Sequence, residues 1–176
     1  MKIYILRHAD AVDREDPRYK DSERPLTRKG IQRTRLLAHV FRRLDIRFDL
    51  ILSSPLLRAR DTARIIARGI HPPPPPPQLS SNLAPSGSMD QLVHELNAIQ
   101  PMPKSVLLCG HEPFLSSFIS LLCTGGPDLA LTLKKGGLCR LDVDLPSCNR
   151  CATLDWLVQP RLLTAKKPKR DRAVDL

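Results

Sequence analysis

The chain has 176 residues, which is enough for one ordinary domain with a buried core. Hydrophobic residues make up 41% of it and charged residues 26%, which places the sequence among globular proteins rather than disordered chains. Lysine and arginine number 28 against 18 aspartate and glutamate residues, giving a net charge of +10. This excess favours anionic partners, such as phosphorylated substrates, polyphosphate, nucleic acid or acidic proteins.

Neither a secretory signal nor a membrane span is expected. The first apolar run has four residues, too few for the apolar part of a signal peptide. The most apolar region, near residues 106–123, is interrupted by Gly110, His111 and Pro113. These features predict a cytoplasmic protein that does not act at a membrane.

The five cysteines are an odd number, which argues against a disulfide framework. Cys148 and Cys151 form a C-x-x-C pattern. Zinc would need two further ligands and the sequence holds no second such pair, so two cysteines in a turn are favoured over a metal site.

The first part of the chain predicts a strand followed by a helix. Residues 2–6, KIYIL, have the composition of a short buried strand, and residues 11–25 are charged and predict a loop. Apolar residues recur at near-helical spacing between residues 27 and 44, and Thr27 is a suitable N-cap.

A second strand is predicted for residues 48–54, FDLILSS. A helix should follow directly, with Ser54 as its N-cap, Pro55 at its first position and Gly69 at its end.

Six consecutive prolines, residues 72–77, exclude both a helix and a central strand. They predict a stiff polyproline II segment. Docking to an SH3-type partner is the alternative, but the flanking basic anchor residues are absent, so a connecting loop is favoured.

The remaining elements continue the alternation. Residues 88–100 predict an amphipathic helix, residues 105–110 an apolar strand, and residues 111–123 another helix with a proline just inside its start. Two alternating strands are predicted at residues 136–145 and 151–160, with a turn between them.

Strands that alternate with helices predict an α/β fold with three layers, in which helices cover both faces of a mostly parallel sheet. We expect one domain over residues 1–163 and a flexible basic tail over residues 164–176, which contains the sequence KKPKRDR. In such folds the functional crevice lies beyond the carboxyl ends of the strands.

Cationic residues follow three of the predicted strands. Arg7 and His8 end the first strand, Arg58 lies one turn into the helix after the second, and His111 follows the third. Each has an ordinary explanation, because a strand-end arginine is usually solvated and a lone histidine is usually structural. Their repetition at one edge of the sheet favours an anion pocket with helix N-termini alongside.

The residues at these strand ends resemble a known family. The stretches LRHAD, LSSPLLRARDTA and VLLCGHEP are similar to the three motifs of the histidine phosphatase superfamily, which has the phosphoglycerate-mutase-like fold. The stretch ERPLTRKG, which holds Arg24, resembles a fourth motif of the small SixA-type phosphohistidine phosphatases. The resemblance covers about residues 1–160. Many relatives have glycine after the histidine, where this chain has Ala9, whose backbone is more restricted.

The resemblance implies a covalent mechanism without a metal or another cofactor. His8 would be the nucleophile and form a phosphohistidine, which water then hydrolyses. Four cationic side chains would hold the phosphoryl oxygens and supply positioning and electrostatic stabilisation: Arg7, Arg24, Arg58 and His111.

Two further residues are assigned to the substrate side of the site. Asp21 is expected to orient Arg24 or to relay a proton, with a solvated loop acid as the alternative. Ser54 is expected to help bind the substrate from the end of the second strand.

The sequence shows no clear general acid, because it lacks the long insertion that supplies one in larger relatives, and Glu95 falls within a helix pattern. A phosphoramidate leaves more easily than an alkoxide, which favours phosphohistidine on a protein as the substrate. The alternatives are a small-metabolite phosphatase of the same family and a non-catalytic module that binds polyphosphate or another polyanion. The presence of His8 argues against a pure binder, and scarce aromatic residues make nucleic acid an unfavoured partner.

Overall fold

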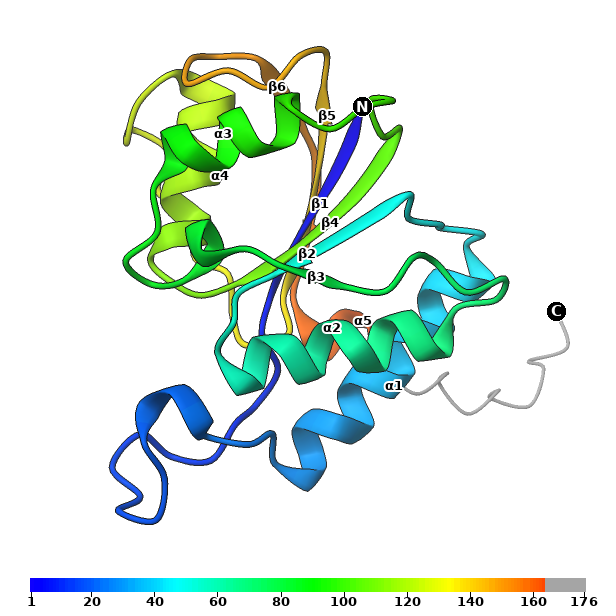
Figure 1. The fold of residues 1–176 in the computed structure, drawn as a ribbon, viewed down its shortest axis with the longest axis vertical. Coiled ribbons are helices and arrows are strands. Elements are labelled where there is room, and N and C mark those ends of the chain that lie inside the picture. Colours follow the sequence, from blue (N-terminus) through cyan, green and yellow to red (C-terminus); the bar gives the residue numbers. More distant parts are fainter. Residues whose placement is uncertain (164–176) are drawn as a thin grey trace, which may run out of the picture.

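A six-stranded sheet forms the middle layer of the molecule (Figure 1). The computed structural model describes residues 1–163, and the predicted basic tail at 164–176 lies outside the described residues. The strand order across the sheet is β3-β2-β4-β1-β5-β6. The strands are β1 (Lys2–Arg7), β2 (Leu50–Ser53), β3 (Gln78–Leu79), β4 (Ser105–Gly110), β5 (Leu138–Val143) and β6 (Ala152–Val158).

The predicted α/β fold with a mostly parallel sheet is confirmed. Strand β4 pairs in parallel with β1 on one side and β2 on the other, and β3 pairs in parallel with β2. Strand β5 is antiparallel to both of its neighbours, β1 and β6. The beginning of β5 therefore lies at the same edge of the sheet as the ends of β1, β2 and β4.

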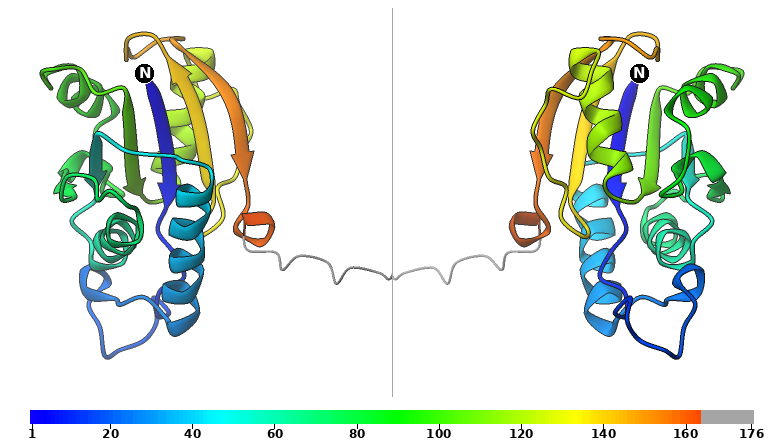
Figure 2. Two further views of the ribbon diagram at one scale, coloured as in Figure 1. Left: turned by 90° about the vertical axis from the view of Figure 1, so that its right-hand side faces the viewer. Right: turned by 90° about the vertical axis from the view of Figure 1, so that its left-hand side faces the viewer.

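Helices cover both faces of the sheet and complete the three layers (Figures 1 and 2). Helices α3 (Met89–Asn97) and α4 (Phe114–Thr124) lie on one face, and α1 (Arg28–Arg43), α2 (Leu57–Gly69) and α5 (Pro160–Leu163) lie on the other. Two short 3-10 helices, η1 (Asp21–Glu23) and η2 (Ser81–Leu83), lie in connecting segments. Within residues 1–163, no helix combines the length and the apolarity that crossing a membrane requires.

The central strands are apolar throughout because they are buried on both faces. In β1, Ile3 and Ile5 belong to the core under α3 and α4, whereas Tyr4 and Leu6 belong to the core under α1 and α2. Successive side chains of a strand point to opposite faces, so this single strand contributes to both cores.

The structure confirms one predicted helix cap and corrects the other. The Thr27 hydroxyl accepts a hydrogen bond from the Gly30 N–H at 3.0 Å, as an N-cap should. Helix α2, in contrast, begins at Leu57, and Ser54 lies outside it. The Ser54 N–H still donates to the Cys109 carbonyl of β4 at 2.9 Å, so the chain has not yet left the sheet where the helix was expected to begin.

The proline run connects α2 to an edge strand that sequence reasoning missed. Residues 72–77 form neither helix nor strand, as predicted. The chain then pairs with β2 through Gln78 and Leu79, which lie opposite Leu52 and Ser53. A two-residue strand is too short to produce a recognisable alternation of apolar and polar residues.

Gly30 allows α1 to lie directly against the loop that follows β1. A Cβ atom at this position would overlap with the backbone carbonyl oxygen of Asp10. That oxygen also accepts a hydrogen bond from the Thr27 N–H at 2.9 Å, so the first turn of α1 fixes the loop two residues beyond His8.

We therefore expect Gly30→Ala to destabilise the protein by about 1–3 kcal/mol through this overlap. In an exposed helix the same change stabilises by about 1 kcal/mol, so the sign of the effect is diagnostic. Urea denaturation measures it, with Gln32→Ala on an exposed position of α1 as the matched control. A Gly30→Ala protein as stable as the wild type would show that the close approach imposes no constraint.

Candidate active site

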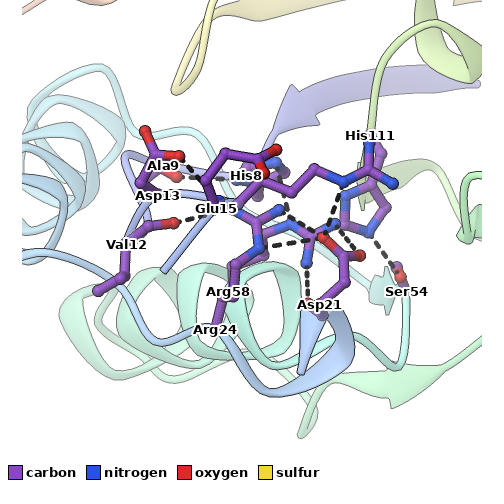
Figure 3. A network of polar contacts seen from close by, with 11 residues as sticks. His8, Ala9, Val12, Asp13, Glu15, Asp21, Arg24, Ser54, Arg58 and His111 are labelled. Carbon is purple, nitrogen blue, oxygen red and sulfur yellow. Dashed lines mark hydrogen bonds and ion pairs between the residues drawn. The ribbon is translucent and has the colours of Figure 1, made fainter. Parts of the chain in front are cut away.

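The ends of β1, β2 and β4 bring the predicted residues together. The His8 N–H donates to the Gly110 carbonyl at 3.0 Å, and the Ser54 N–H donates to the Cys109 carbonyl at 2.9 Å. His111 directly follows the last residue of β4. The predicted convergence of the three strand ends is thus what the structure shows (Figure 3).

A pocket of about 330 Å³ opens at this edge of the sheet. Six of the seven residues that the sequence singled out line it, and Ser54 does not. The lining residues are Arg7, His8, Asp13, Arg14, Asp21, Arg24, Arg58, Pro85, His111, Glu112 and Lys135.

His8 presents an unprotonated nitrogen to the other site residues. Its Nδ1 lies 2.8 Å from the Ala9 carbonyl oxygen, and the Arg58 Nε donates to its Nε2 at 3.3 Å. A nitrogen that accepts a hydrogen bond carries a lone pair, so we assign the proton to Nδ1, which donates to Ala9. The lone pair of Nε2 is the one suited to attack an electrophile.

Burial keeps this imidazole neutral. His8 is only 5% exposed, and burial together with the charges of His111, Arg58 and Arg7 lowers its pKa to about 3, against the hydrogen bond to Ala9. A neutral imidazole is the nucleophilic form, so His8 is ready to react at neutral pH.

Alanine at position 9 causes no backbone strain. Among the described residues other than glycine, Asp45 is the one with a positive φ, so Ala9 keeps an ordinary conformation. The Ala9 N–H donates to the Thr62 hydroxyl at 3.1 Å, and that hydroxyl donates to the Arg58 carbonyl at 2.7 Å. These contacts fix the Ala9 peptide that orients His8.

His111 lies opposite His8, with the two ring centroids 5.0 Å apart. Its Nε2 is 2.8 Å from the Ser54 hydroxyl, and its Nδ1 has no hydrogen-bond partner among the described residues. Burial and the nearby Arg58 charge lower the pKa of His111 to about 3. A buried polar atom without a partner is costly, and an incoming oxyanion would offer it one when the ring is protonated at Nδ1.

Ser54, which was predicted to help bind the substrate, is not among the residues that line the pocket. It is fully buried, and its hydroxyl contacts His111 rather than the open pocket. Because it acts through another side chain, we describe Ser54 as a positioning residue for His111.

Asp21 lies between two arginines and accepts hydrogen bonds from both (Figure 3). Arg24 donates to its Oδ1 through Nε and Nη2 at 3.0 and 2.8 Å. Arg58 donates to its backbone oxygen at 2.7 Å and to its Oδ2 at 3.3 Å. Asp21 thus holds both guanidinium groups, and its own side chain is 41% exposed.

The two arginines also set the charge of Asp21. Burial alone would raise the pKa of its carboxyl, but hydrogen bonds from Arg24 and the charges of Arg58 and Arg24 lower that pKa below its usual value. Asp21 is ionised at neutral pH and is poorly suited to donate a proton.

Arg7 and Glu112 connect the site to the segment that leads into β5. Arg7 Nη1 donates to the Leu133 carbonyl at 2.8 Å, and the Leu133 N–H donates to Glu112 Oε1 at 2.9 Å. The other Glu112 oxygen accepts a hydrogen bond from the Ser116 hydroxyl at 2.6 Å. Burial lowers the pKa of Arg7, and the nearby Glu112 charge opposes that shift.

Sequence reasoning did not assign Glu112 or Lys135 to the site. Glu112 directly follows His111, so its adjacency to a strand-end histidine was an available signal. Lys135 precedes β5, and its place became predictable only once β5 was known to begin at the carboxyl edge of its neighbours.

The cysteines do not form a recognisable metal centre. All five are free thiols. Within residues 1–163, no group of three or more histidine, cysteine, aspartate or glutamate side chains is placed to hold a metal ion. Cys148 and Cys151 lie in the segment between β5 and β6.

The arrangement combines a neutral nucleophilic nitrogen with cationic and N–H donors on several sides. An oxyanion bound between the histidines would contact guanidinium groups whose geometry matches oxygen pairs. The site is therefore suited to attack on a phosphoryl group by nitrogen.

Sequence comparisons agree with this geometry. A family model described as histidine phosphatase superfamily (branch 1) matches residues 3–84. An uncharacterized protein of Picosynechococcus sp. is 40% identical over 142 residues, which cover 78% of this chain and 82% of that protein. The phosphohistidine phosphatase SixA of Escherichia coli (strain K12) is 31% identical over 127 residues, which cover 71% of this chain and 76% of that protein.

Solved structures share this fold over most of the chain. The structure of the protein histidine phosphatase SixA complexed with tungstate aligns with a TM-score of 0.78 and 28% identity, covering 93% of this chain and 99% of that one. A putative alpha-ribazole-5'-P phosphatase from Escherichia coli shares the fold, with a TM-score of 0.71 at 21% identity, over 91% of this chain and 98% of that one.

The low pKa of both histidines predicts a specific pH dependence of stability. Their pKa is about 3 in the folded protein and about 6.5 in an unfolded chain. Between these values the unfolded chain binds more protons, so the free energy of unfolding should fall as pH is lowered from about 6.5 towards 3. The limiting slope is about 1.4 kcal/mol per pH unit for each histidine.

Urea denaturation at several pH values tests this expectation. The His8→Asn protein should show a shallower dependence than the wild type, because one of the two groups is gone. His94→Asn, at an exposed position of α3, serves as the matched control and should keep the wild-type slope. An unchanged slope in His8→Asn would mean that His8 is not held neutral in the fold.

Proposed function

This chain is a phosphatase that belongs to the histidine phosphatase superfamily, and from this premise we propose that it removes phosphate from phosphohistidine on a protein through a covalent intermediate on His8. The observation that carries the proposal is the neutral, buried His8, whose Nε2 lone pair lies beside the Arg58 guanidinium at 3.3 Å. A nucleophile held next to cationic donors meets the needs of phosphoryl transfer.

In the first step, the Nε2 lone pair of His8 attacks phosphorus and forms a P–N bond. The bond between phosphorus and the substrate nitrogen breaks, and its electron pair stays on the substrate imidazole, which leaves neutral if its ring carried a proton beforehand. The His8 ring becomes cationic, and its Nδ1–H donation to the Ala9 carbonyl, 2.8 Å away, stabilises that charge.

In the second step, water attacks the phosphorus of the intermediate. The P–N bond to His8 breaks and its electrons return to Nε2, while one proton of the water passes to a phosphoryl oxygen, so that phosphate is released as H₂PO₄⁻ and His8 is neutral again. Arg7, Arg24, Arg58 and a His111 protonated at Nδ1 would supply donors to the oxygens in both steps, so the transition-state charge meets preorganised partners.

Two of the three acids that line the pocket, Asp21 and Glu112, support a phosphoramidate substrate. The third, Asp13, accepts a hydrogen bond from the Glu15 N–H at 2.9 Å. Asp21 is engaged by Arg24 and Arg58, and Glu112 by Leu133 and Ser116. Both carboxylates are thus used as acceptors, which leaves them poor proton donors to a leaving group. An alkyl phosphate needs such a donor, whereas a protonated phosphohistidine carries its own.

The sequence match and the structure match to proteins named SixA support the same substrate. One of them is a structure complexed with tungstate, an oxyanion that resembles phosphate. An oxyanion of this kind fits a pocket with four cationic or N–H-bearing groups. A small phosphorylated metabolite would use the same chemistry, so the choice between protein and metabolite is decided by experiment.

The test of the mechanism is to trap the phosphoenzyme. Wild-type protein is mixed with ³²P-labelled phosphoramidate, quenched at alkaline pH where phosphohistidine survives, and digested to locate the label. The label should lie on His8, and His8→Ala should lose at least about 10³-fold in turnover because the covalent route is gone.

His94→Ala, at an exposed histidine of α3, is the matched control and should keep both label and turnover. Wild-type turnover in folded His8→Ala would refute the covalent mechanism. Binding of polyphosphate without hydrolysis of any phosphorylated compound would instead assign the pocket to a non-catalytic module.

Substrate class is tested by comparing kcat/KM for a phosphohistidine protein domain, free phosphohistidine and alkyl phosphate metabolites. A protein phosphatase should prefer the domain, whereas preference for an alkyl phosphate would identify a metabolite phosphatase of the same superfamily.

Activity is expected to survive EDTA, because the pocket itself supplies the positive charge that Mg²⁺ provides in many phosphoryl transfers. The measurement is phosphoramidate hydrolysis before and after chelation and dialysis. Loss of activity that Mg²⁺ or Zn²⁺ restores would show that a metal ion takes part.

A further inference from the structure

A second groove adjoins the catalytic pocket. It has a volume of about 440 Å³ and lies between α1, the end of β1, the segment before β5 and the start of α5. Arg7 and Lys135 line both the groove and the pocket, so the two are continuous. The residues lining the groove are Arg7, Asp10, Arg33, Lys134, Lys135, Gln159, Pro160 and Arg161.

The groove has a large excess of positive charge. Its one acid, Asp10, is already paired with Arg33 at 3.0 Å. The side chains of Lys134, Lys135 and Arg161 are exposed and form no salt bridge within the described part of the chain. Nothing in the proposed chemistry at His8 uses Lys134 or Arg161.

Hydrogen bonds of the Gln159 side chain hold one wall of the groove in place. Gln159 accepts a hydrogen bond from the Lys134 N–H at 3.3 Å through its side-chain oxygen. Its side-chain nitrogen donates to the Thr132 carbonyl at 3.0 Å. One amide therefore fixes the backbone that carries the lysines against the end of β6.

We propose that this groove binds an acidic segment of the protein substrate, with carboxylates beside the phosphohistidine contacting Lys134 and Arg161. The inference rests on the proposed function, because the groove is useful only if the group in the pocket belongs to a polypeptide. Its continuity with the pocket through Arg7 and Lys135 places the flanking residues of such a substrate directly over these cations.

Charge and size favour this occupant. The groove is larger than the catalytic pocket, so it has more room than one phosphoryl group fills. An extended peptide advances about 3.3 Å per residue, so the residues next to the phosphohistidine would reach into the groove. The chain's own segment 166–176 carries five basic and two acidic residues. Its net charge is positive like that of the groove, so the two repel each other and the segment is a poor occupant.

The experiment uses two peptides phosphorylated on one histidine, one flanked by Asp and Glu and the other by Asn and Gln. The groove variant is Lys134→Glu/Arg161→Glu. Its matched control is Lys2→Glu/Lys104→Glu, which changes the net charge equally at exposed positions on the opposite edge of the sheet. We measure kcat/KM for both peptides and for phosphoramidate, and the binding of unphosphorylated, fluorescent peptides by anisotropy.

The wild type should hydrolyse the acidic peptide about tenfold more efficiently than the neutral one, with the difference shrinking as salt screens the charges. The groove variant should lose this preference while hydrolysing phosphoramidate as before. In the anisotropy measurement it should bind the acidic and the neutral peptide equally, whereas the wild type should bind the acidic one more tightly. The control should behave like the wild type.

Equal efficiency for both peptides in the wild type would overturn the inference. So would equal loss of the preference in the Lys2→Glu/Lys104→Glu control, because the effect would then come from net charge. If the groove variant kept the preference for the acidic peptide, the flanking carboxylates would bind elsewhere, which would also overturn the inference. Failure of the wild type to hydrolyse any of the three substrates would refute the proposed function, and the anisotropy comparison would still decide the groove.

Discussion

The site depends on the pairing of β4 with β1 on one side and β2 on the other. Arg7 lies opposite Gly110 and Ser53 lies opposite Cys109, so the three strands end at nearly the same level. A slip of one residue would turn each side chain of a strand to the other face of the sheet. Because both faces are buried under helices, that slip would disrupt both cores. The apolar packing of the sheet therefore also fixes the relative positions of His8, Ser54 and His111.

This framework holds several cations close together without an equal number of anions. Asp21 neutralises part of the charge of Arg24 and Arg58, and carbonyl oxygens accept the remaining contacts. Arg7 Nε and His111 Nδ1 are nevertheless buried without partners among the described residues. Such unmet hydrogen-bonding capacity weakens the folded state and favours binding of an oxyanion. Stability lost in the free protein thus contributes to affinity for the phosphoryl group.

Much of the site could be predicted because its residues follow apolar strands. The motifs around His8 and around His111 are each continuous in the sequence. They lie close together because the strands that precede them, β1 and β4, are parallel neighbours. The role of Ser54 could not be predicted, since it depends on a hydrogen bond across 57 positions of the chain. Lys135 depends on the direction of β5, and Glu112 on its contact with Leu133, which are both results of tertiary packing. The start of α2 was misplaced because capping preferences describe helices in isolation, whereas Ser54 is still bonded to the sheet.

The proline run also determines where the sheet stops. Strand β3 pairs with β2 only through Gln78 and Leu79, and continuing that register backwards would place Pro77 and Pro76 opposite Ile51 and Leu50. Proline has no N–H to donate, so the ladder cannot grow in that direction. An outermost strand with free N–H and carbonyl groups is a template on which another chain can add, and natural sheets commonly guard such edges. By limiting β3 to two residues, the prolines of residues 72–77 leave only a short edge strand on which another chain could pair.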